Sequence, residues 1–212
     1  MRYNQAMDIE FIYFDVGGVV VLDMSKNNKF DQMLAEMGLT EEMKQKFSDY
    51  FIDKVETDIC RGEKTVDSLI PQMRNVYGAN LPDDYSFLED FTSRFEANTK
   101  LQEIMINLKK RYPIGLLTNM YPGMLQSISR RGLLPEIDWD AVIDSSIVHH
   151  NKPEPEIYEL AETLAKTKPE RILFVENSQM HIDGAAKRSW QTLLYDPANV
   201  DGANKRLIDL VA

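Results

Sequence analysis

The most informative stretch of this sequence is residues 11–20, FIYFDVGGVV. Four apolar residues, Phe11–Phe14, end at the carboxylate of Asp15, and Gly17 and Gly18 follow after one valine. A short, continuous apolar run is typical of a strand buried on both faces, as in a parallel sheet. The glycines let the backbone turn sharply and approach an anion or a metal closely. The stretch therefore predicts a strand that delivers a carboxylate to the sheet edge where ligands bind in open α/β folds.

Three further apolar runs follow much later, at Ile114–Leu117, Ala141–Ile143 and Ile172–Val175. Helical spacing of apolar residues predicts a helix ending near Leu108, with Thr99 and Gln102 as a capping box at its start. Three more stretches read as helices: Glu156–Lys166, Gln179–Arg188 and Asn204–Val211. Strands alternating with helices predict an α/β fold with a parallel sheet flanked by helices.

The segment between the first two apolar runs does not show this alternation of strands and helices. From Met24 to Asn98 no strong strand signal occurs, and apolar residues recur at helical spacing, for example in Phe30–Met37. We read this segment as a helical insertion placed just after the first strand. We therefore predict a core domain of residues 1–23 and 98–212, and an α-helical cap domain of residues 24–97.

The composition of the chain limits the kinds of partner that it can bind. The chain has 212 residues, a formal net charge of −10 and a pI near 4.8, so it offers no broad basic surface for nucleic acid. Apolar runs such as Val16–Leu22 are too short to cross a bilayer, and Met1–Glu10 carries no hydrophobic signal region. The single cysteine, Cys60, suits a reducing compartment. We expect a cytoplasmic protein that binds neither nucleic acid nor membrane; its oligomeric state stays open.

Polar side chains at the ends of the predicted strands suit phosphoryl transfer. They are Asp15, Thr118, Asn119, Lys152 in a loop entering a helix, and Glu176 with Asn177. An aspartate can attack phosphorus and form an aspartyl-phosphate. Thr118 can donate to a phosphate oxygen, and Lys152 can offset the crowded negative charge. Mg²⁺ prefers hard oxygen ligands, which Asp15, the Gly17 carbonyl and Glu176 can supply.

The order of these motifs resembles the haloacid dehalogenase-like (HAD) hydrolase superfamily, most closely its phosphatase-like members with a helical cap after the first motif. The motifs are residues 11–20, Ile114–Asn119, Asn151–Tyr158 and Ile172–Ala185, with Arg61-Gly62-Glu63 as a cap turn. The resemblance implies a HAD-like Rossmannoid core and hydrolysis of a small phosphorylated metabolite, such as a sugar phosphate, with Mg²⁺ as cofactor. It implies catalytic roles for Asp15, Thr118 and Lys152. It implies substrate binding by Gly17, Gly18, Arg61, Thr118, Asn119 and Lys152, and metal binding by Asp15, Gly17, Glu176 and Asn177.

The chain departs from the family pattern at two points. Gly17 stands where most members carry a second aspartate that acts as general acid and base, a function worth about 10²- to 10⁴-fold in rate. The nearest acid downstream, Asp23, is a candidate substitute. Glu176-Asn177 replaces a pair of aspartates, which removes one charge and weakens the predicted Mg²⁺ site. His181 stands where the family often has asparagine. It could reach the rim of the site, but we favour the reading of a helix-surface residue.

These departures leave three functions open. A Mg²⁺-dependent phosphatase requires Asp15 and Mg²⁺ for turnover. A metal-independent 2-haloacid dehalogenase would release halide in the presence of EDTA, although such enzymes generally carry a tyrosine at the position of Gly17. A catalytically weakened domain would bind a phosphorylated ligand or a partner without turning it over, and ligand would then stabilise the fold without forming product.

Overall fold

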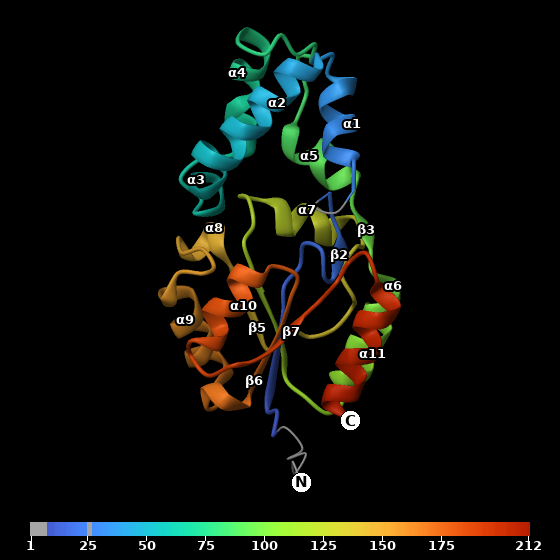
Figure 1. Ribbon diagram of the computed structural model, residues 1–212, viewed down its shortest axis with the longest axis vertical. Helices are drawn as coiled ribbons and strands as arrows, with labels where there is room; N and C mark the ends of the chain where they lie inside the picture. Colours follow the sequence, from blue (N-terminus) through green and yellow to red (C-terminus); the bar gives the residue numbers. More distant parts are fainter. Residues whose placement is uncertain (1–7, 25–26) are drawn as a thin grey trace.

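Five parallel strands form the central sheet of the computed structural model, which describes residues 8–24 and 27–212 (Figure 1). In spatial order they are β5 (Ala141–Asp144), β4 (Ile114–Thr118), β1 (Phe11–Phe14), β6 (Ile172–Glu176) and β7 (Gln191–Leu194). All four neighbouring pairs run parallel. The sheet confirms the predicted α/β class and puts β1 at its centre.

Helices cover both faces of this sheet. Ile12 and Phe14 of β1 pack with α6 (Thr99–Leu108) and α11 (Val200–Val211), whereas Phe11 and Tyr13 pack with α9 (Pro155–Ala165) and α10 (Gln179–Ala186). Successive side chains of a strand point to opposite faces, so a continuous apolar run feeds two cores at once. The shorter helices α7 (Met124–Arg130) and α8 (Ser145–Val148) follow β4 and β5. A single 3₁₀ turn, Pro169–Arg171, leads into β6.

Two details differ from the sequence predictions. Strand β7 was not predicted, because its edge position leaves Gln191, Thr192 and Leu193 only half-buried and the run carries little apolar signal. Helix α6 begins at Thr99, but its N-cap is Asn98, whose side chain accepts from the backbone N–H of Leu101 at 3.4 Å. The predicted capping box at Thr99 and Gln102 is therefore wrong, because the N-cap lies one residue earlier, at Asn98.

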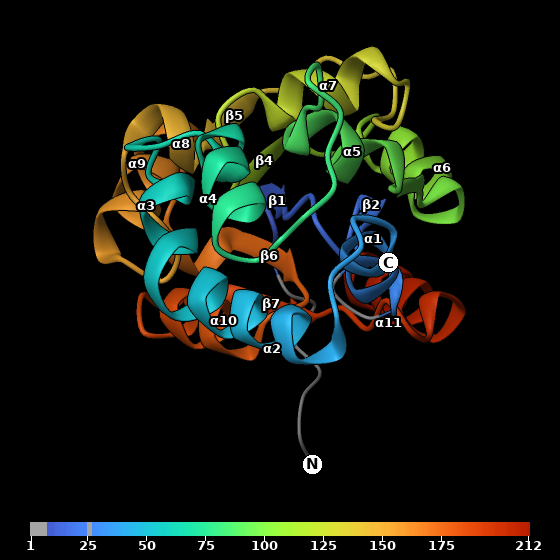
Figure 2. The same ribbon diagram turned by 90° about the horizontal axis from the view of Figure 1, so that it is seen from above.

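A helical segment stands over the carboxyl ends of the strands (Figures 1 and 2). It contains α1 (Lys29–Glu36), α2 (Glu41–Tyr50), a π-helical turn (Phe51–Val55), α3 (Glu56–Cys60), a 3₁₀ turn (Val66–Leu69), α4 (Ile70–Asn75) and α5 (Phe87–Ser93). A two-stranded antiparallel ribbon, β2 (Val21–Leu22) with β3 (Glu96–Ala97), pairs the chain entering the segment with the chain leaving it. The entrance and the exit therefore lie beside each other, next to the end of β1.

Aromatic side chains hold this helical segment together and against the sheet layer. Phe47, Phe51, Phe87 and Phe91 contact one another through tilted and edge-on ring pairs. Phe51 and Phe91 also meet Tyr121, which follows β4, edge-on at 6.1 and 5.9 Å between ring centres. In the described part of the chain no helix has the length and apolarity needed to cross a membrane.

Candidate active site

The register of the sheet brings three predicted side chains to one edge. Phe14 is level with Leu116 of β4 and with Val175 of β6. Asp15, one residue beyond β1, therefore lies beside the end of β4 at Thr118 and the end of β6 at Glu176. The backbone N–H of Asp15 donates to the carbonyl of Val175 at 2.9 Å, which extends the strand pairing to the carboxylate itself.

Lys152 lies between two carboxylates at this edge. Its ammonium Nζ is 2.9 Å from Asp15 Oδ1 and 2.5 Å from Glu176 Oε2. The side chains of Lys152 and Glu176 are 0% exposed, and that of Asp15 is 10% exposed. Burial alone would lower the pKa of Lys152, but Asp15 and Glu176 outweigh it and raise that pKa. The lysine therefore carries a fixed positive charge inside the site.

Protein donors already occupy both oxygens of Glu176. Oε1 accepts from the backbone N–H groups of Asn177 and Ser178, each at 2.8 Å. Oε2 receives Lys152 and lies 3.1 Å from Nδ1 of His181. Burial would raise the pKa of Glu176, but the charge of Lys152 and the His181 contact lower it to about 2. Glu176 is therefore a permanently ionised support for Lys152 and His181.

The pKa of Asp15 is shifted upward, in the opposite direction to that of Glu176. Burial and the nearby charge of Glu176 raise its pKa, Lys152 only partly offsets them, and the result is about 6. A buried carboxylate whose charged form is disfavoured in this way is typical of functional sites. At neutral pH Asp15 is mostly ionised and is the carboxylate of this pair that faces the pocket.

Two polar side chains at the end of β4 have different surroundings. Thr118 is completely buried, and its hydroxyl Oγ1 has no hydrogen-bond partner among the described residues. Asn119 exchanges two hydrogen bonds with the backbone of Lys152, at 3.0 and 2.8 Å, and so fixes the lysine loop. A buried hydroxyl without a partner costs free energy unless a ligand satisfies it. Thr118 ends β4 near Asp15, but it is not among the residues that line the pocket.

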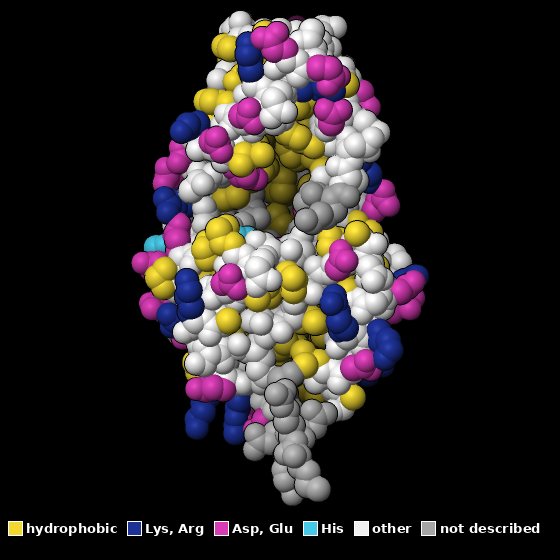
Figure 3. Space-filling model, viewed as in Figure 1, with side chains coloured by type: hydrophobic (Ala, Val, Ile, Leu, Met, Phe, Trp, Pro, Cys, Tyr) yellow, Lys and Arg dark blue, Asp and Glu magenta, His cyan; other side chains and the backbone are white. Residues whose placement is uncertain are grey.

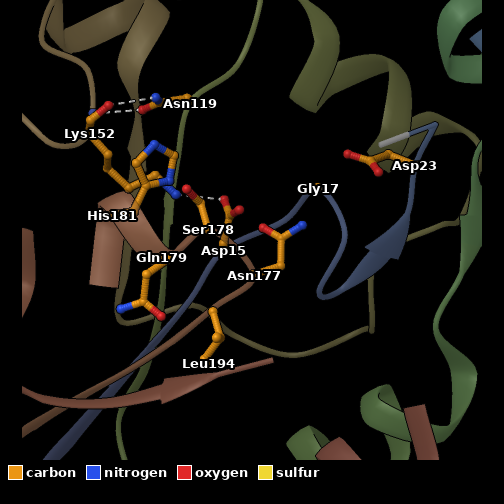
Figure 4. A pocket seen from close by; sticks show the side chains of 10 residues that line it. All are labelled: Asp15, Gly17, Asp23, Asn119, Lys152, Asn177, Ser178, Gln179, His181 and Leu194. Atoms are coloured by element: carbon orange, nitrogen blue, oxygen red, sulfur yellow. Dashed lines mark hydrogen bonds and ion pairs between the residues drawn. The ribbon is translucent and has the colours of Figure 1, made fainter. Parts of the chain in front are cut away.

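A pocket of about 560 Å³ opens over Asp15 (Figure 4). It is lined by Asp15, Gly17, Asp23, Asn119, Lys152, Asn177, Ser178, Gln179, His181 and Leu194. Figure 3 shows a hollow between the helices of the upper segment, with hydrophobic side chains on its wall. The pocket itself has a charged floor at the sheet edge, and Leu194 is the one large apolar side chain among its lining residues.

Some side chains lie elsewhere than the sequence suggested. Arg61 lies outside the pocket lining and forms an ion pair with Glu154. Gly18, predicted to bind substrate, is also absent from the pocket lining; it forms the expected turn in the left-handed region (φ 72°), and its N–H donates to the carbonyl of Val21. The interpretation of His181 as a surface residue is wrong: it lines the pocket and contacts Glu176. Leu194 was missed, because the edge strand that carries it was missed.

The residues present fit a Mg²⁺ ion with few protein ligands. Asp15 offers a carboxylate, Gly17 a carbonyl, and Asn177 an amide that lies in the pocket (Figure 4). Mg²⁺ is usually bound through one or two carboxylates together with substrate phosphates and water. Glu176, with both oxygens engaged by protein donors, offers the ion much less than Asp15 does.

Comparison with known proteins identifies the family. The haloacid dehalogenase-like hydrolase model matches residues 11–187, and the chain belongs to this family. Mouse bifunctional epoxide hydrolase 2 is 26% identical over 153 residues, which cover 64% of this chain. This chain spans about a quarter of the length of the curated relatives it matches, 27% of the mouse protein.

Solved structures share the fold at low identity. A HAD family enzyme from Bacteroides thetaiotaomicron, in complex with magnesium and inorganic phosphate, superposes with a TM-score of 0.73 at 17% identity, covering 89% of this chain and 95% of that one. The L-2-haloacid dehalogenase from Xanthobacter autotrophicus with chloropropionic acid covalently bound gives a TM-score of 0.61 at 21% identity, covering 87% and 76%. At these identities the likeness establishes the fold.

Proposed function

We propose that this HAD-like hydrolase is a Mg²⁺-dependent phosphatase that acts on a small phosphorylated metabolite through an aspartyl-phosphate on Asp15. The observation that carries the proposal is the buried pair of Asp15 and Lys152, 2.9 Å apart, beside the unpartnered hydroxyl of Thr118. A carboxylate nucleophile, a fixed cation and a hydroxyl donor together suit a tetrahedral anion. The net charge of −10 favours a small anion captured by such local donors over nucleic acid, and we keep the proposal of a cytoplasmic protein.

The chemistry follows from the positions of these groups. A carboxylate oxygen of Asp15 attacks phosphorus, the bond from phosphorus to the leaving oxygen breaks, and water later hydrolyses the acyl phosphate. Lys152, which is held by Glu176, balances the charge that develops on the phosphoryl oxygens. Thr118 donates to one of these oxygens and orients the group for attack.

Asp15, the Gly17 carbonyl and Asn177 would hold Mg²⁺, and we propose that Glu176 supports the site from behind. The ion supplies positive charge beside the phosphoryl group when bound. The magnesium and phosphate in the Bacteroides enzyme support this proposal.

We further propose that the helical segment acts as the cap, residues 24–97, over a core of residues 1–23 and 98–212. The β2–β3 ribbon at its base supports that division. A cap above the pocket would exclude water from the reacting phosphoryl group and present the apolar hollow to the rest of the substrate.

Hydrolysis of 4-nitrophenyl phosphate tests the proposal, with wild type and Asp15→Asn, in Mg²⁺ and in EDTA. We expect turnover only with both Asp15 and Mg²⁺. Undiminished turnover in Asp15→Asn would refute the assignment of Asp15 as the nucleophile. Binding of inorganic phosphate with no turnover of a panel of phosphomonoesters would instead identify a ligand-binding domain.

One observation favours a second candidate, a metal-independent 2-haloacid dehalogenase. With Glu176 engaged on both oxygens and Asn177 neutral, Asp15 is the one carboxylate of the predicted metal set available to an ion. In this reaction Asp15 would attack carbon and displace halide. Halide release from chloroacetate in EDTA would support this candidate, and its absence, with phosphate release intact, would remove it.

A further inference from the structure

Gly17 has no side chain, and the space where one would begin is already filled by another residue. A Cβ atom built on Gly17 would lie 2.6 Å from Oδ2 and 3.6 Å from Cγ of Asp23. A contact of 2.6 Å is far below any ordinary carbon–oxygen separation. The carboxylate of Asp23 therefore occupies the place from which a side chain at position 17 would reach into the pocket.

The local backbone explains how a residue six positions later returns to Gly17. The N–H of Gly18 donates to the carbonyl of Val21 at 2.8 Å, and the N–H of Val21 donates to Val16 at 2.9 Å. A β-bridge links Gly17 with Val21, and Val21–Leu22 then pairs with Glu96–Ala97. Asp23 follows this ribbon directly, so its backbone is placed by hydrogen bonds on both sides of the turn.

Asp23 also faces the same pocket as the nucleophile. It lines the pocket with Asp15 and Lys152, and Figure 4 shows it on the other side of Gly17 from Lys152. Lys152 thus contacts Asp15 on the side toward β6, and Asp23 lies on the side toward the helical segment.

An acidic side chain of the helical segment lies near Asp23. The carboxylate of Glu56, in α3, accepts a part-buried hydrogen bond of 2.9 Å from the hydroxyl of Tyr121. Burial raises the pKa of Glu56, and the negative charge of Asp23 raises it further. Asp23, which lines the pocket, therefore interacts electrostatically with an acid of the helical segment.

We infer that Asp23 is the general acid and base of this enzyme and performs the function for which Gly17 has no side chain. The inference rests on the proposed phosphatase function. When Asp15 attacks phosphorus and the P–O bond breaks, the Asp23 carboxylic acid gives its proton to the departing oxygen, which leaves as an alcohol. The Asp23 carboxylate then takes a proton from the water that attacks the aspartyl-phosphate, so Asp15 is regenerated and inorganic phosphate is released.

The test compares Asp23→Asn and Asp23→Ala with a matched control, Asp53→Asn, whose aspartate is exposed on the π-helical turn. The substrates are phenyl phosphate, whose leaving oxygen needs a proton, and 4-nitrophenyl phosphate, whose leaving group departs as a stable anion. We expect both Asp23 variants to lose about 10²- to 10⁴-fold in turnover of phenyl phosphate. With 4-nitrophenyl phosphate they release a burst of about one nitrophenolate per enzyme and then slow down, because hydrolysis of the aspartyl-phosphate lacks its base.

Formate should restore turnover to Asp23→Ala, which distinguishes proton transfer from a structural effect, and thermal melting checks that each variant folds. Equal rates for wild type and both Asp23 variants would overturn the inference while leaving the phosphatase intact. Equal losses on both substrates, with neither a burst nor rescue by formate, would overturn it too. Inactivity of the wild type on both esters would overturn the proposed function and this inference with it.

Discussion

Replacing Asp15 with asparagine should make the metal-free protein more stable at alkaline pH while abolishing its activity. The pKa of Asp15 is about 6 in the folded chain against an ordinary 3.8, so at pH 8 the folded state carries a penalty of about 3 kcal/mol for keeping this carboxylate ionised. Asparagine keeps the shape and removes the charge, and Lys152 retains Glu176 at 2.5 Å. Asp15→Asn should recover most of that free energy.

The sign of the pH dependence follows from the direction of the shift. Below the ordinary pKa Asp15 is protonated in both the folded and the unfolded chain, and the penalty vanishes. It grows as the pH rises toward about 6 and is constant above that value. The stabilisation should therefore be roughly half as large at pH 5 as at pH 8.

Urea denaturation of wild type and Asp15→Asn in EDTA, at pH 5 and at pH 8, measures the difference in the free energy of unfolding at each pH. A gain of about 3 kcal/mol corresponds to a rise of about 6 to 12 °C in melting temperature for a chain of this size. Asp53→Asn, at an exposed position of the helical segment, serves as the control and should change neither value. A variant Asp15→Asn that is less stable than wild type at pH 8 would refute the assignment of Asp15 as a carboxylate held at a cost for function.

Three further variants test other parts of the site. Lys152→Met leaves two buried carboxylates without their ammonium and should lower the free energy of unfolding by about 3 to 5 kcal/mol in urea; a loss below about 1 kcal/mol would contradict the buried ion pairs. Thr118→Val should leave stability within about 1 kcal/mol of wild type but raise the Kd for inorganic phosphate about 10- to 100-fold by calorimetry, and unchanged affinity would count against a phosphate at this hydroxyl. Arg61→Ala, which breaks a partly exposed ion pair with Glu154, should change KM by no more than about 5-fold, and a larger rise would favour direct substrate binding by Arg61.

The strands of the core were predictable where the sequence signal is continuous. Phe11–Phe14 and Ile172–Val175 are apolar throughout because both of their faces are covered. Strand β7 is the last strand of the sheet, and no strand of the described residues pairs with its outer edge. Its half-buried positions therefore tolerate Gln191 and Thr192, and the apolar pattern disappears. The end of an apolar run also located Asp15, Thr118 and Glu176, because parallel strands deliver their carboxyl ends to one edge.

The remaining features depend on distances that no sequence pattern encodes. Whether His181 faces water or Glu176 depends on the rotation of α10 against the sheet. Whether Oε1 of Glu176 accepts two hydrogen bonds from the protein depends on how the backbone N–H groups of Asn177 and Ser178 are oriented after β6. Asp23 could be chosen from the sequence as the nearest acid downstream, but its approach to Gly17 depends on the turn that folds Val21 back onto Val16.

Mass spectrometry of the enzyme, quenched in acid during turnover of 4-nitrophenyl phosphate with Mg²⁺, would detect the proposed aspartyl-phosphate on Asp15 itself. Acid preserves an acyl phosphate long enough to digest the chain and locate the modification. We predict one added phosphoryl group on the peptide that contains Asp15, and none in Asp15→Asn. Steady release of inorganic phosphate with no phosphoryl group on that peptide, or with the group on another residue, would show that Asp15 is not the nucleophile.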